Sequence, residues 1–170
     1  MVLLITLFWW MGSGDQISTL NGYKTAKVVR VWDGDTYTLL VGGNKISARL
    51  KNIDSPEMSQ LYGKECKEAL EALLLSKDVS FSIDGLDKYK RYLVQLWVDG
   101  ERLDKVLLKN GWAWHYVTYS QDEELVKLQQ EAIRKRIGLW EGGVEGICPP
   151  WIYRQYNRIN RLKYCSNCKR

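Results

Sequence analysis

Carboxylates and arginines are concentrated in three short segments of the chain, and two of the carboxylates are suited to hold a metal ion. The segments are VWDGDT at residues 31–36, RLKNIDSPE at 49–57 and DKYKRY at 87–92. A hard divalent cation prefers oxygen ligands, and Asp35 and Asp54 can supply two carboxylates. Such an ion polarises a phosphoryl oxygen and activates water for attack on phosphorus.

Two arginines and one glutamate supply the other groups that phosphodiester hydrolysis needs. In the transition state the equatorial phosphate oxygens gain negative charge, and a guanidinium matches their geometry with paired hydrogen bonds. Arg49 and Arg91 are the candidates for this contact. Glu57 follows Asp54 closely, which puts a carboxylate within reach of the attacking water as a proton acceptor. The set of groups for metal-assisted hydrolysis is therefore complete.

Each segment taken alone also has a purely structural interpretation. Asp33-Gly34-Asp35 is a common turn sequence, and acids flanking Pro56 can cap the N-terminus of a helix. The two arginines can form surface ion pairs that contribute little to stability. Only the joint occurrence of the three segments, in this order around predicted strands, favours a catalytic site.

The strands and helices that must position these segments follow from hydrophobic periodicity. β-Branched and aromatic residues predict strands at 24–31, 37–41, 45–50, 79–83 and 92–98, with a hairpin turn at 42–44. Apolar spacing and capping residues predict helices at 63–75, at 103–109 and from Ser120 or Asp122 to residue 136. This order predicts an α+β fold, a five-stranded OB-fold β-barrel with about three α-helices. Such a fold alone leaves nucleic acid binding and catalysis equally open.

The three segments together resemble the staphylococcal nuclease (thermonuclease) family. The resemblance rests on DGDT at 33–36, R-x-x-x-x-D-S-P-E at 49–57 and DKY-x-R at 87–91. It extends from about Ala26 to Trp140, which is most of the chain.

The resemblance implies a calcium site. Calcium would be bound by the carboxylates of Asp35 and Asp54 and by the backbone carbonyl of Ser55. Asp33 would orient the loop that carries the ligands without binding the ion itself. Serine stands at position 55 where threonine is frequent in the family, which has no consequence if only the carbonyl is used.

The same resemblance implies the catalytic and substrate-binding residues. Arg49 and Arg91 would grip the phosphate and stabilise the transition state, and Glu57 would hold and activate the attacking water. The substrate would also be contacted by Lys88, Tyr89 and Tyr119.

Two positions depart from the family pattern. Lys90 stands before Arg91 where glycine is usual, so a positive φ at Lys90 would be strained and would affect the placement of Arg91. We expect activity to survive this change. The second aromatic residue of the family's base pocket has no clean match, because Val117 falls there and Tyr116 is one residue away.

The resemblance implies a calcium-dependent endonuclease that hydrolyses phosphodiester bonds in DNA and RNA by metal-activated water attack. Little sequence specificity and 3′-phosphate products are expected, from a monomer with no obligate protein partner. The alternative is a non-catalytic OB-fold module that binds nucleic acid. Degenerate modules tend to lose an acid or an arginine of the site, whereas this chain retains the full set. A structural calcium-binding protein is a weaker alternative, because two arginines beside the ion would oppose its binding.

Composition divides the chain into three predicted parts. These are an apolar N-terminal segment with a linker at 1–21, the nuclease-like domain at 22–141 and a basic extension at 142–170. The apolar run at 1–11 is too short to span a bilayer and fits a signal peptide, so we expect a secreted or extracytoplasmic protein. No basic residue precedes this run, which leaves a cytoplasmic location as the alternative.

The basic charge is concentrated in the C-terminal extension. The net charge is +5, and residues 151–170 hold six basic groups and no acidic group. This pattern fits either a solvated tail or a segment that docks on a polyanion. Cys165 and Cys168 form an isolated CxxC pair, for which a local disulfide, reduced thiols and a metal shared between chains all stay open. His115 is the only histidine, so mechanisms that need two imidazoles within one chain are excluded.

Overall fold

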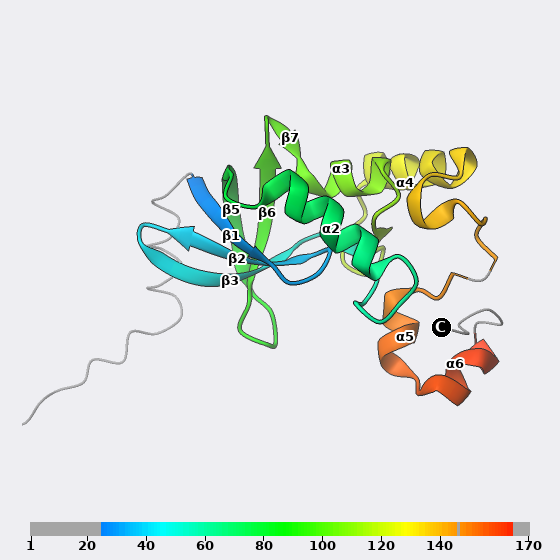
Figure 1. Cartoon of the computed structure of the whole chain (residues 1–170). Coiled ribbons are helices and arrows are strands. Elements are labelled where there is room, and N and C mark those ends of the chain that lie inside the picture. Colours follow the sequence, from blue (N-terminus) through cyan, green and yellow to red (C-terminus); the bar gives the residue numbers. More distant parts are fainter. Residues whose placement is uncertain (1–24, 146, 165–170) are drawn as a thin grey trace, which may run out of the picture.

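A closed barrel of five strands forms the centre of the protein in the computed structural model, which describes residues 25–145 and 147–164 (Figure 1). The barrel strands are β1 (Thr25–Val31), β2 (Thr36–Val41), β3 (Asn44–Leu50), β5 (Asp78–Leu86) and β6 (Tyr92–Val98). They are hydrogen-bonded in the order β3-β2-β1-β5-β6, and a parallel pairing of β3 with β6 closes the ring. The predicted five-stranded OB-fold barrel and the α+β class are confirmed.

Short strands and helices surround the barrel. The short strands are β4 (Ile53–Asp54), which pairs with β8 (Trp114–His115), and β7 (Glu101–Arg102), which pairs with β6. The helices are α2 (Gly63–Leu74), α3 (Leu103–Lys109), α4 (Glu123–Lys135), α5 (Pro150–Gln155) and α6 (Arg158–Tyr164), with a 3-10 turn at Gly138–Trp140. The first three match the predicted helices, whereas the sequence analysis assigned no element to the segment that forms α5 and α6.

Alternating side chains explain why β3 takes its place in the barrel wall. Ile46, Ala48 and Leu50 point into the core, whereas the alternate residues Lys45 and Ser47 are exposed. β3 reaches β2 through a two-residue turn whose glycines both have positive φ, as the tightest hairpin turns require.

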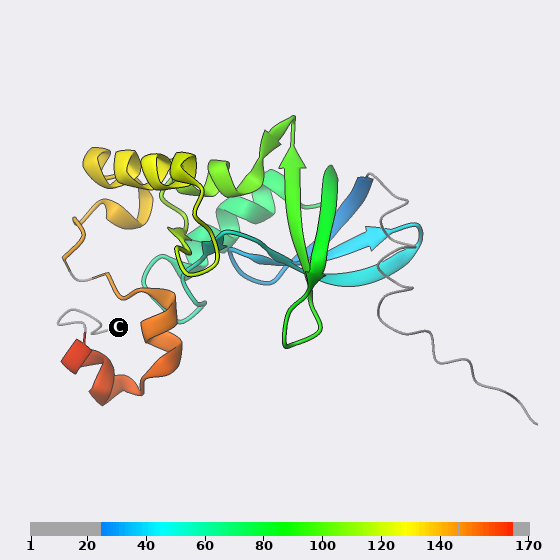
Figure 2. The same ribbon diagram turned by 180° about the vertical axis from the view of Figure 1, so that it is seen from behind.

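Helix α2 covers one end of the barrel, against β1. Its buried residues Cys66, Leu70 and Leu74 recur at helical spacing on one face. Helices α3 and α4 pack on each other beyond the same end, and α5 and α6 lie on the lower side of the molecule in both views (Figure 1, Figure 2). The connection from β5 to β6 also projects to this lower side (Figure 2).

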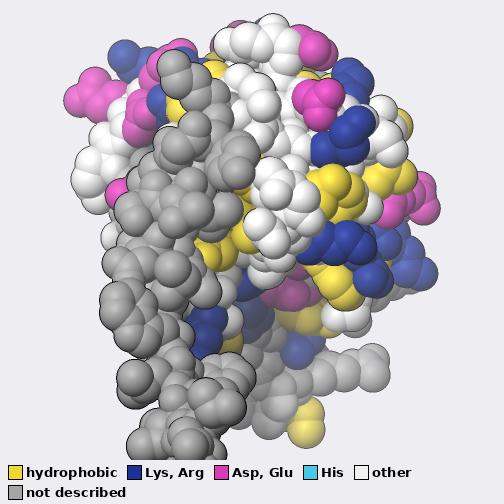
Figure 3. Space-filling model, turned by 90° about the vertical axis from the view of Figure 1, so that its left-hand side faces the viewer, with side chains coloured by type: hydrophobic (Ala, Val, Ile, Leu, Met, Phe, Trp, Pro, Cys, Tyr) yellow, Lys and Arg dark blue, Asp and Glu magenta, His cyan; other side chains and the backbone are white. Residues whose placement is uncertain are grey.

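The surface carries intermixed charges. On the face shown in Figure 3, basic and acidic side chains lie side by side with hydrophobic ones exposed between them. Among the described residues, none of the helices combines the length and apolarity of a membrane span. The predicted signal peptide at 1–14 and the CxxC pair at 165–168 lie outside the described residues, so these predictions stay predictions. Cys148, shortly before α5, is disulfide-bonded.

A strained turn joins β5 to β6 just before Arg91. The backbone N–H of Asp87 donates to the Arg91 carbonyl at 2.9 Å, and that of Lys90 donates to the Asp87 carbonyl at 3.0 Å. Lys90 has φ of 62°, in the left-handed region where a side chain is unfavourable. The conformation that glycine would adopt freely is therefore kept here by a lysine.

Replacing Lys90 with glycine should stabilise the protein. The left-handed conformation destabilises the folded state by about 1–2 kcal/mol at a non-glycine residue. Glycine removes this strain but increases the entropy of the unfolded chain, which lowers the free energy of unfolding by only about 0.5–1 kcal/mol. We expect Lys90→Gly to raise the free energy of unfolding by up to about 1 kcal/mol, measured by urea denaturation. The control Lys45→Gly, at an exposed strand position, should lower it, and equal losses in both variants would contradict the assigned strain.

Candidate active site

A cleft of about 1120 Å³ lies beside the barrel and is lined by residues of the β5–β6 loop and of helix α5, among others. It is lined by nine of the residues predicted for the site, which are Asp33, Asp35, Arg49, Ser55, Glu57, Lys88, Tyr89, Arg91 and Tyr119. The remaining predicted residue, Asp54, is fully buried and does not line the cleft. The barrel therefore brings three distant segments of sequence to one opening.

The loop between β1 and β2 fixes Asp35 at the cleft. The Asp33 carboxylate accepts hydrogen bonds from the backbone N–H groups of Asp35 at 3.0 Å and Thr36 at 2.7 Å, which holds a tight turn. The hydroxyl of the buried Tyr37 donates to the Gly34 carbonyl at 2.8 Å and ties the loop to the core. Asp33 thus orients the segment that carries Asp35, which is the supporting position predicted for it.

Arg49 joins the two predicted metal ligands. Its Nε lies 3.0 Å from Oδ1 of Asp35, and its Nη2 lies 3.2 Å from Oδ1 of Asp54. A further bond, from Nη1 to the Ile53 carbonyl at 3.0 Å, fixes the plane of the guanidinium. Because one guanidinium spans both carboxylates, Asp35 and Asp54 lie close enough to share a cation.

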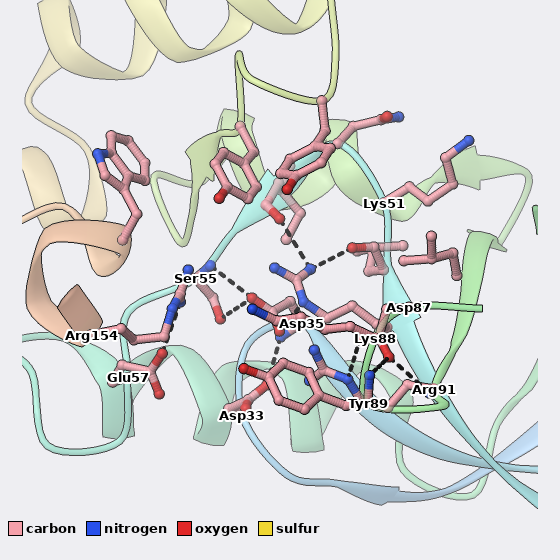
Figure 4. Close-up of a pocket in the computed structure, with 18 of the residues that line it drawn as sticks. Asp33, Asp35, Lys51, Ser55, Glu57, Asp87, Lys88, Tyr89, Arg91 and Arg154 are labelled. Atoms are coloured by element: carbon pink, nitrogen blue, oxygen red, sulfur yellow. Dashed lines mark hydrogen bonds and ion pairs between the residues drawn. The ribbon is translucent and has the colours of Figure 1, made fainter. Parts of the chain in front are cut away.

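Asp35 also accepts hydrogen bonds from its neighbour Thr36 and from Ser55, which follows β4. The backbone N–H and the hydroxyl of Ser55 each donate to its Oδ2 at 2.9 Å, and the Thr36 hydroxyl donates to its Oδ1 at 3.0 Å. Figure 4 shows Asp35 at the centre of the site, between Ser55 and Arg91. This saturated environment holds the Asp35 carboxylate in one orientation.

Arg91 reaches the same centre from the β5–β6 turn. Asp87 accepts from the Arg91 side-chain Nε at 2.7 Å and from its backbone N–H at 2.9 Å. Burial opposes ionisation of Asp87, but the hydrogen bonds from Arg91 outweigh it and hold the pKa of Asp87 below its usual value. Nη1 of Arg91 donates to the Thr36 hydroxyl at 3.0 Å, which links Arg91 to the Asp35 loop. Neither Asp87 nor Thr36 was predicted from the sequence to have a role in the site.

Aromatic and basic side chains stand at the rim of the cleft. Tyr89 and Tyr119 are 69% and 75% exposed, and the Lys88 ammonium lies 5.0 Å from the centre of the Tyr89 ring. The Tyr119 ring contacts that of Tyr116 at 4.8 Å between centroids. Tyr116 lines the cleft and Val117 does not, so Tyr116 is the second aromatic residue beside Tyr119.

Helix α5 contributes an arginine that the sequence analysis counted only as part of the basic extension. Nη1 and Nη2 of Arg154 lie 3.0 and 2.7 Å from the two carboxylate oxygens of Asp54. Nη1 also lies 2.9 Å from Oε1 of Glu57 (Figure 4). Proline at the first helical position and aromatic residues around Arg154 are the sequence signals that mark this helix.

Several contacts dock α5 against the barrel beside the site. The Trp151 ring stacks on the Tyr116 ring at 5.7 Å with an interplanar angle of 5°. The Tyr153 and Ser59 hydroxyls are hydrogen-bonded at 2.8 Å. The buried Gln60 donates to the Cys148 carbonyl at 2.9 Å, just before the helix. Arg154 is therefore delivered to the acids by a packed helix.

Burial disfavours the ionised carboxylates of the site, so nearby positive charge stabilises them. Burial and the neighbouring Asp35 carboxylate raise the pKa of Asp33 to about 6. Burial also raises the pKa of Asp54, although Arg154 and Arg49 partly offset it. Arg154 itself has a raised pKa, because its hydrogen bonds to Asp54 and Glu57 outweigh burial.

The donor atoms fit a hard divalent cation. Within the described part of the chain, no cluster of three or more His, Cys, Asp or Glu side chains is arranged as a metal site. Asp35 lines the cleft, and Asp54 lies directly behind it, joined to Asp35 through Arg49. A cation held by these two carboxylates would need carbonyl and water oxygens to complete its coordination shell. Calcium and magnesium accept such mixed oxygen ligands, whereas zinc prefers nitrogen and sulfur.

His115 has a structural position. It is only 2% exposed and pairs with Ile53 across the β4–β8 ladder, and burial lowers the pKa of its imidazole. His115 therefore packs in a short strand and does not line the cleft.

Comparison with known proteins identifies the family. The family model described as staphylococcal nuclease homologue matches residues 47–142. The chain belongs to the staphylococcal nuclease family. The family of the resemblance is thus confirmed, and the protein is a nuclease whose substrates are nucleic acids. Asp33 and Asp35 precede the matched residues, and Arg154 follows them.

Curated relatives carry the same kind of name. The chain is 40% identical to an uncharacterized endonuclease of Haemophilus influenzae, over 81% of this chain and 76% of that protein. It is 36% identical to an uncharacterized endonuclease of Escherichia coli, over 75% of this chain and 83% of that protein. It is also 37% identical to the staphylococcal-like nuclease CAN1 of Arabidopsis thaliana, over 67% of this chain and 35% of that protein.

The close packing of Gly63 against the Glu57 segment gives a test of how the site is positioned. A Cβ on Gly63 would lie 2.1 Å from the Glu57 carbonyl oxygen, so the backbone must move to admit it. We expect Gly63→Ala to lower the free energy of unfolding by about 1–3 kcal/mol and to lower nuclease activity by displacing Glu57.

The matched control is Gly142→Ala, whose added Cβ would meet nothing within 4 Å. It should leave both urea stability and nuclease activity close to those of the unsubstituted protein. Equal behaviour of the two variants would show that the contact at Gly63 does not position the site.

Proposed function

We propose that this nuclease is a calcium-dependent endonuclease that hydrolyses phosphodiester bonds in DNA and RNA with little sequence specificity. The observation that carries the proposal is the bridge that Arg49 forms between Asp35 and Asp54 at 3.0 and 3.2 Å, beside the cleft that Arg91 and Glu57 line. This arrangement puts ligands for a cation, two arginines and a base in one place.

Calcium would be held by Asp35, Asp54 and the backbone carbonyl of Ser55. When bound, the ion would supply Lewis acidity to a phosphoryl oxygen and favour attack by water. The calcium preference follows from the family resemblance and from the mixed oxygen donors, which suit an ion with a flexible coordination shell.

The two arginines act on the phosphate. Asp87 and Thr36 hold the Arg91 guanidinium in place, so little reorganisation is needed when the phosphate arrives. Arg49 is only 12% exposed and is fixed by its carboxylate and carbonyl contacts. Preorganised guanidinium groups stabilise the charge that develops on the equatorial oxygens.

Glu57 accepts the proton of the attacking water. Its side chain is 35% exposed, so solvent reaches its carboxylate, whereas Asp54 is wholly enclosed. Attack by this water, with the 5′-oxygen leaving, gives a 3′-phosphate product. Of Glu57 and Asp54, only Glu57 is therefore accessible to both water and substrate.

The rim residues bind the rest of the strand. Lys88 attracts a backbone phosphate, and the exposed rings of Tyr89 and Tyr119 offer faces on which bases stack. Such contacts are made with any base, so little sequence preference is expected. We expect the protein to act as a monomer without an obligate protein partner.

A non-catalytic nucleic acid-binding module is the second candidate function. The exposed basic and aromatic rim would serve it equally well. The buried pairing of Arg49 with Asp35 and Asp54 favours catalysis, because strand binding alone does not need charges held out of water.

The first test is cleavage of single- and double-stranded DNA and of RNA with calcium and with a chelator. Chelation should abolish cleavage, and added calcium should restore it. Arg91→Ala should lower kcat by about 100- to 1000-fold, because a preorganised transition-state contact is removed. Arg134→Gln removes an equal charge from the exposed face of α4 and should leave kcat unchanged.

Two results would contradict the proposal. Cleavage that persists in chelator would exclude the metal-dependent mechanism. A folded protein that binds strands but cleaves none would favour the binding module.

A further inference from the structure

Arg154 contacts Asp54 and Glu57, here called the acid pair, on the side from which a cation would approach them. Its two terminal nitrogens contact both oxygens of Asp54 at 3.0 and 2.7 Å, and one of them also contacts Glu57 at 2.9 Å. Asp54 is fully buried, and the Arg154 side chain that covers it is 44% exposed. The guanidinium therefore stands between Asp54 and the cleft.

The contact belongs to a docked element and not to a mobile arm. Helix α5 is held by the stacking of Trp151 on Tyr116 and by the hydrogen bond between Tyr153 and Ser59. The residues matched by the family model end at 142, so α5 lies beyond the matched region. None of the roles described above for residues of the matched region explains why Arg154 contacts Asp54 and Glu57.

Arginines pair with all three carboxylates at the centre of the site. Asp35 and Asp54 share Arg49, and Asp54 and Glu57 share Arg154. A divalent cation at Asp54 would bring two further positive charges next to Arg154, in a partly buried site where charges are weakly screened. Oδ1 of Asp54 already accepts hydrogen bonds from both Arg49 and Arg154, and Oδ2 accepts one from Arg154. Few lone pairs of this carboxylate are therefore left for an ion, and the ion would also be repelled by the guanidinium.

We propose that Arg154 is an internal counter-ion that competes with the divalent cation for Asp54 and Glu57. The proposal rests on the proposed metal-dependent function and adds a regulatory step to it. With the ion absent, Arg154 closes the acid pair; with the ion bound, Arg154 leaves Asp54 and becomes free to meet the phosphate of the strand. The apparent affinity for the cation is then the intrinsic affinity multiplied by the fraction of molecules in the open state, so pairing with Arg154 lowers it.

The test is the affinity for calcium itself, measured by isothermal titration calorimetry on the full chain without nucleic acid. Arg154→Gln should bind calcium about tenfold or more tightly than the unsubstituted protein, since a charge-assisted contact no longer competes. Lys88→Gln removes an equal charge from the same cleft without touching Asp54 or Glu57. It should change the affinity by no more than about twofold, the effect of a screened charge.

Two further variants separate the guanidinium from the packing of its helix. Arg154→Lys keeps the charge but loses the two-pronged contact, so its calcium affinity should lie between those of the unsubstituted protein and Arg154→Gln. Tyr153→Phe removes the hydrogen bond to Ser59 and loosens the dock of α5, so it should tighten calcium binding by a smaller factor than Arg154→Gln. Urea denaturation of each variant establishes that it is folded.

Equal affinities of Arg154→Gln and Lys88→Gln would overturn the competition, because Arg154 would then act only through its charge. Weaker binding by Arg154→Gln would also overturn it and make Arg154 a residue that orients the ligands. Asp54→Asn serves as the reference for the metal site. If the unsubstituted protein binds no more calcium than Asp54→Asn, the proposed metal dependence fails, and the competition fails with it.

Discussion

Two carboxylates held out of water, Asp35 and Asp54, share the guanidinium of Arg49, and much of the structure serves to keep these three groups together. Buried charges are costly unless they are paired and hydrogen-bonded, and removing one partner leaves the others uncompensated. Asp35 enters from the loop before β2, Arg49 from the end of β3 and Asp54 from β4. The closed barrel with this strand order brings the three segments to one point, which ties the fold to the chemistry.

The same requirement explains the tight and strained places around the cleft. Gly34 and Gly63 leave no room for a Cβ where the Asp35 loop and the Glu57 segment meet their neighbours. Lys90 keeps a left-handed backbone in the turn where Asp87 orients Arg91. Strain of this kind persists where the surrounding hydrogen bonds fix the geometry, and here it surrounds the groups that would meet the phosphate.

The fold and most of the site were predictable from sequence because their signals are local. Alternation in β3, the glycine turn before it and the spacing of Cys66, Leu70 and Leu74 in α2 each need only a few neighbouring residues. The place of Arg154 was not predictable. A short helix of mixed aromatic and basic residues has weak periodicity, and its contact with Asp54 spans 100 residues of chain. Tyr116 was uncertain for a related reason, since a shift of one residue in a loop depends on packing against Trp151.

The central claim is that the Asp35–Arg49–Asp54 group is the centre of a metal-dependent phosphodiesterase. The most direct test is a crystal structure of the full chain with calcium and an uncleavable dinucleotide analogue. The account predicts calcium in contact with both carboxylates, the phosphate in contact with Arg49 and Arg91, and Arg154 withdrawn from Asp54. Calcium bound elsewhere, or a phosphate held at the rim with the three groups still paired only to one another, would contradict it.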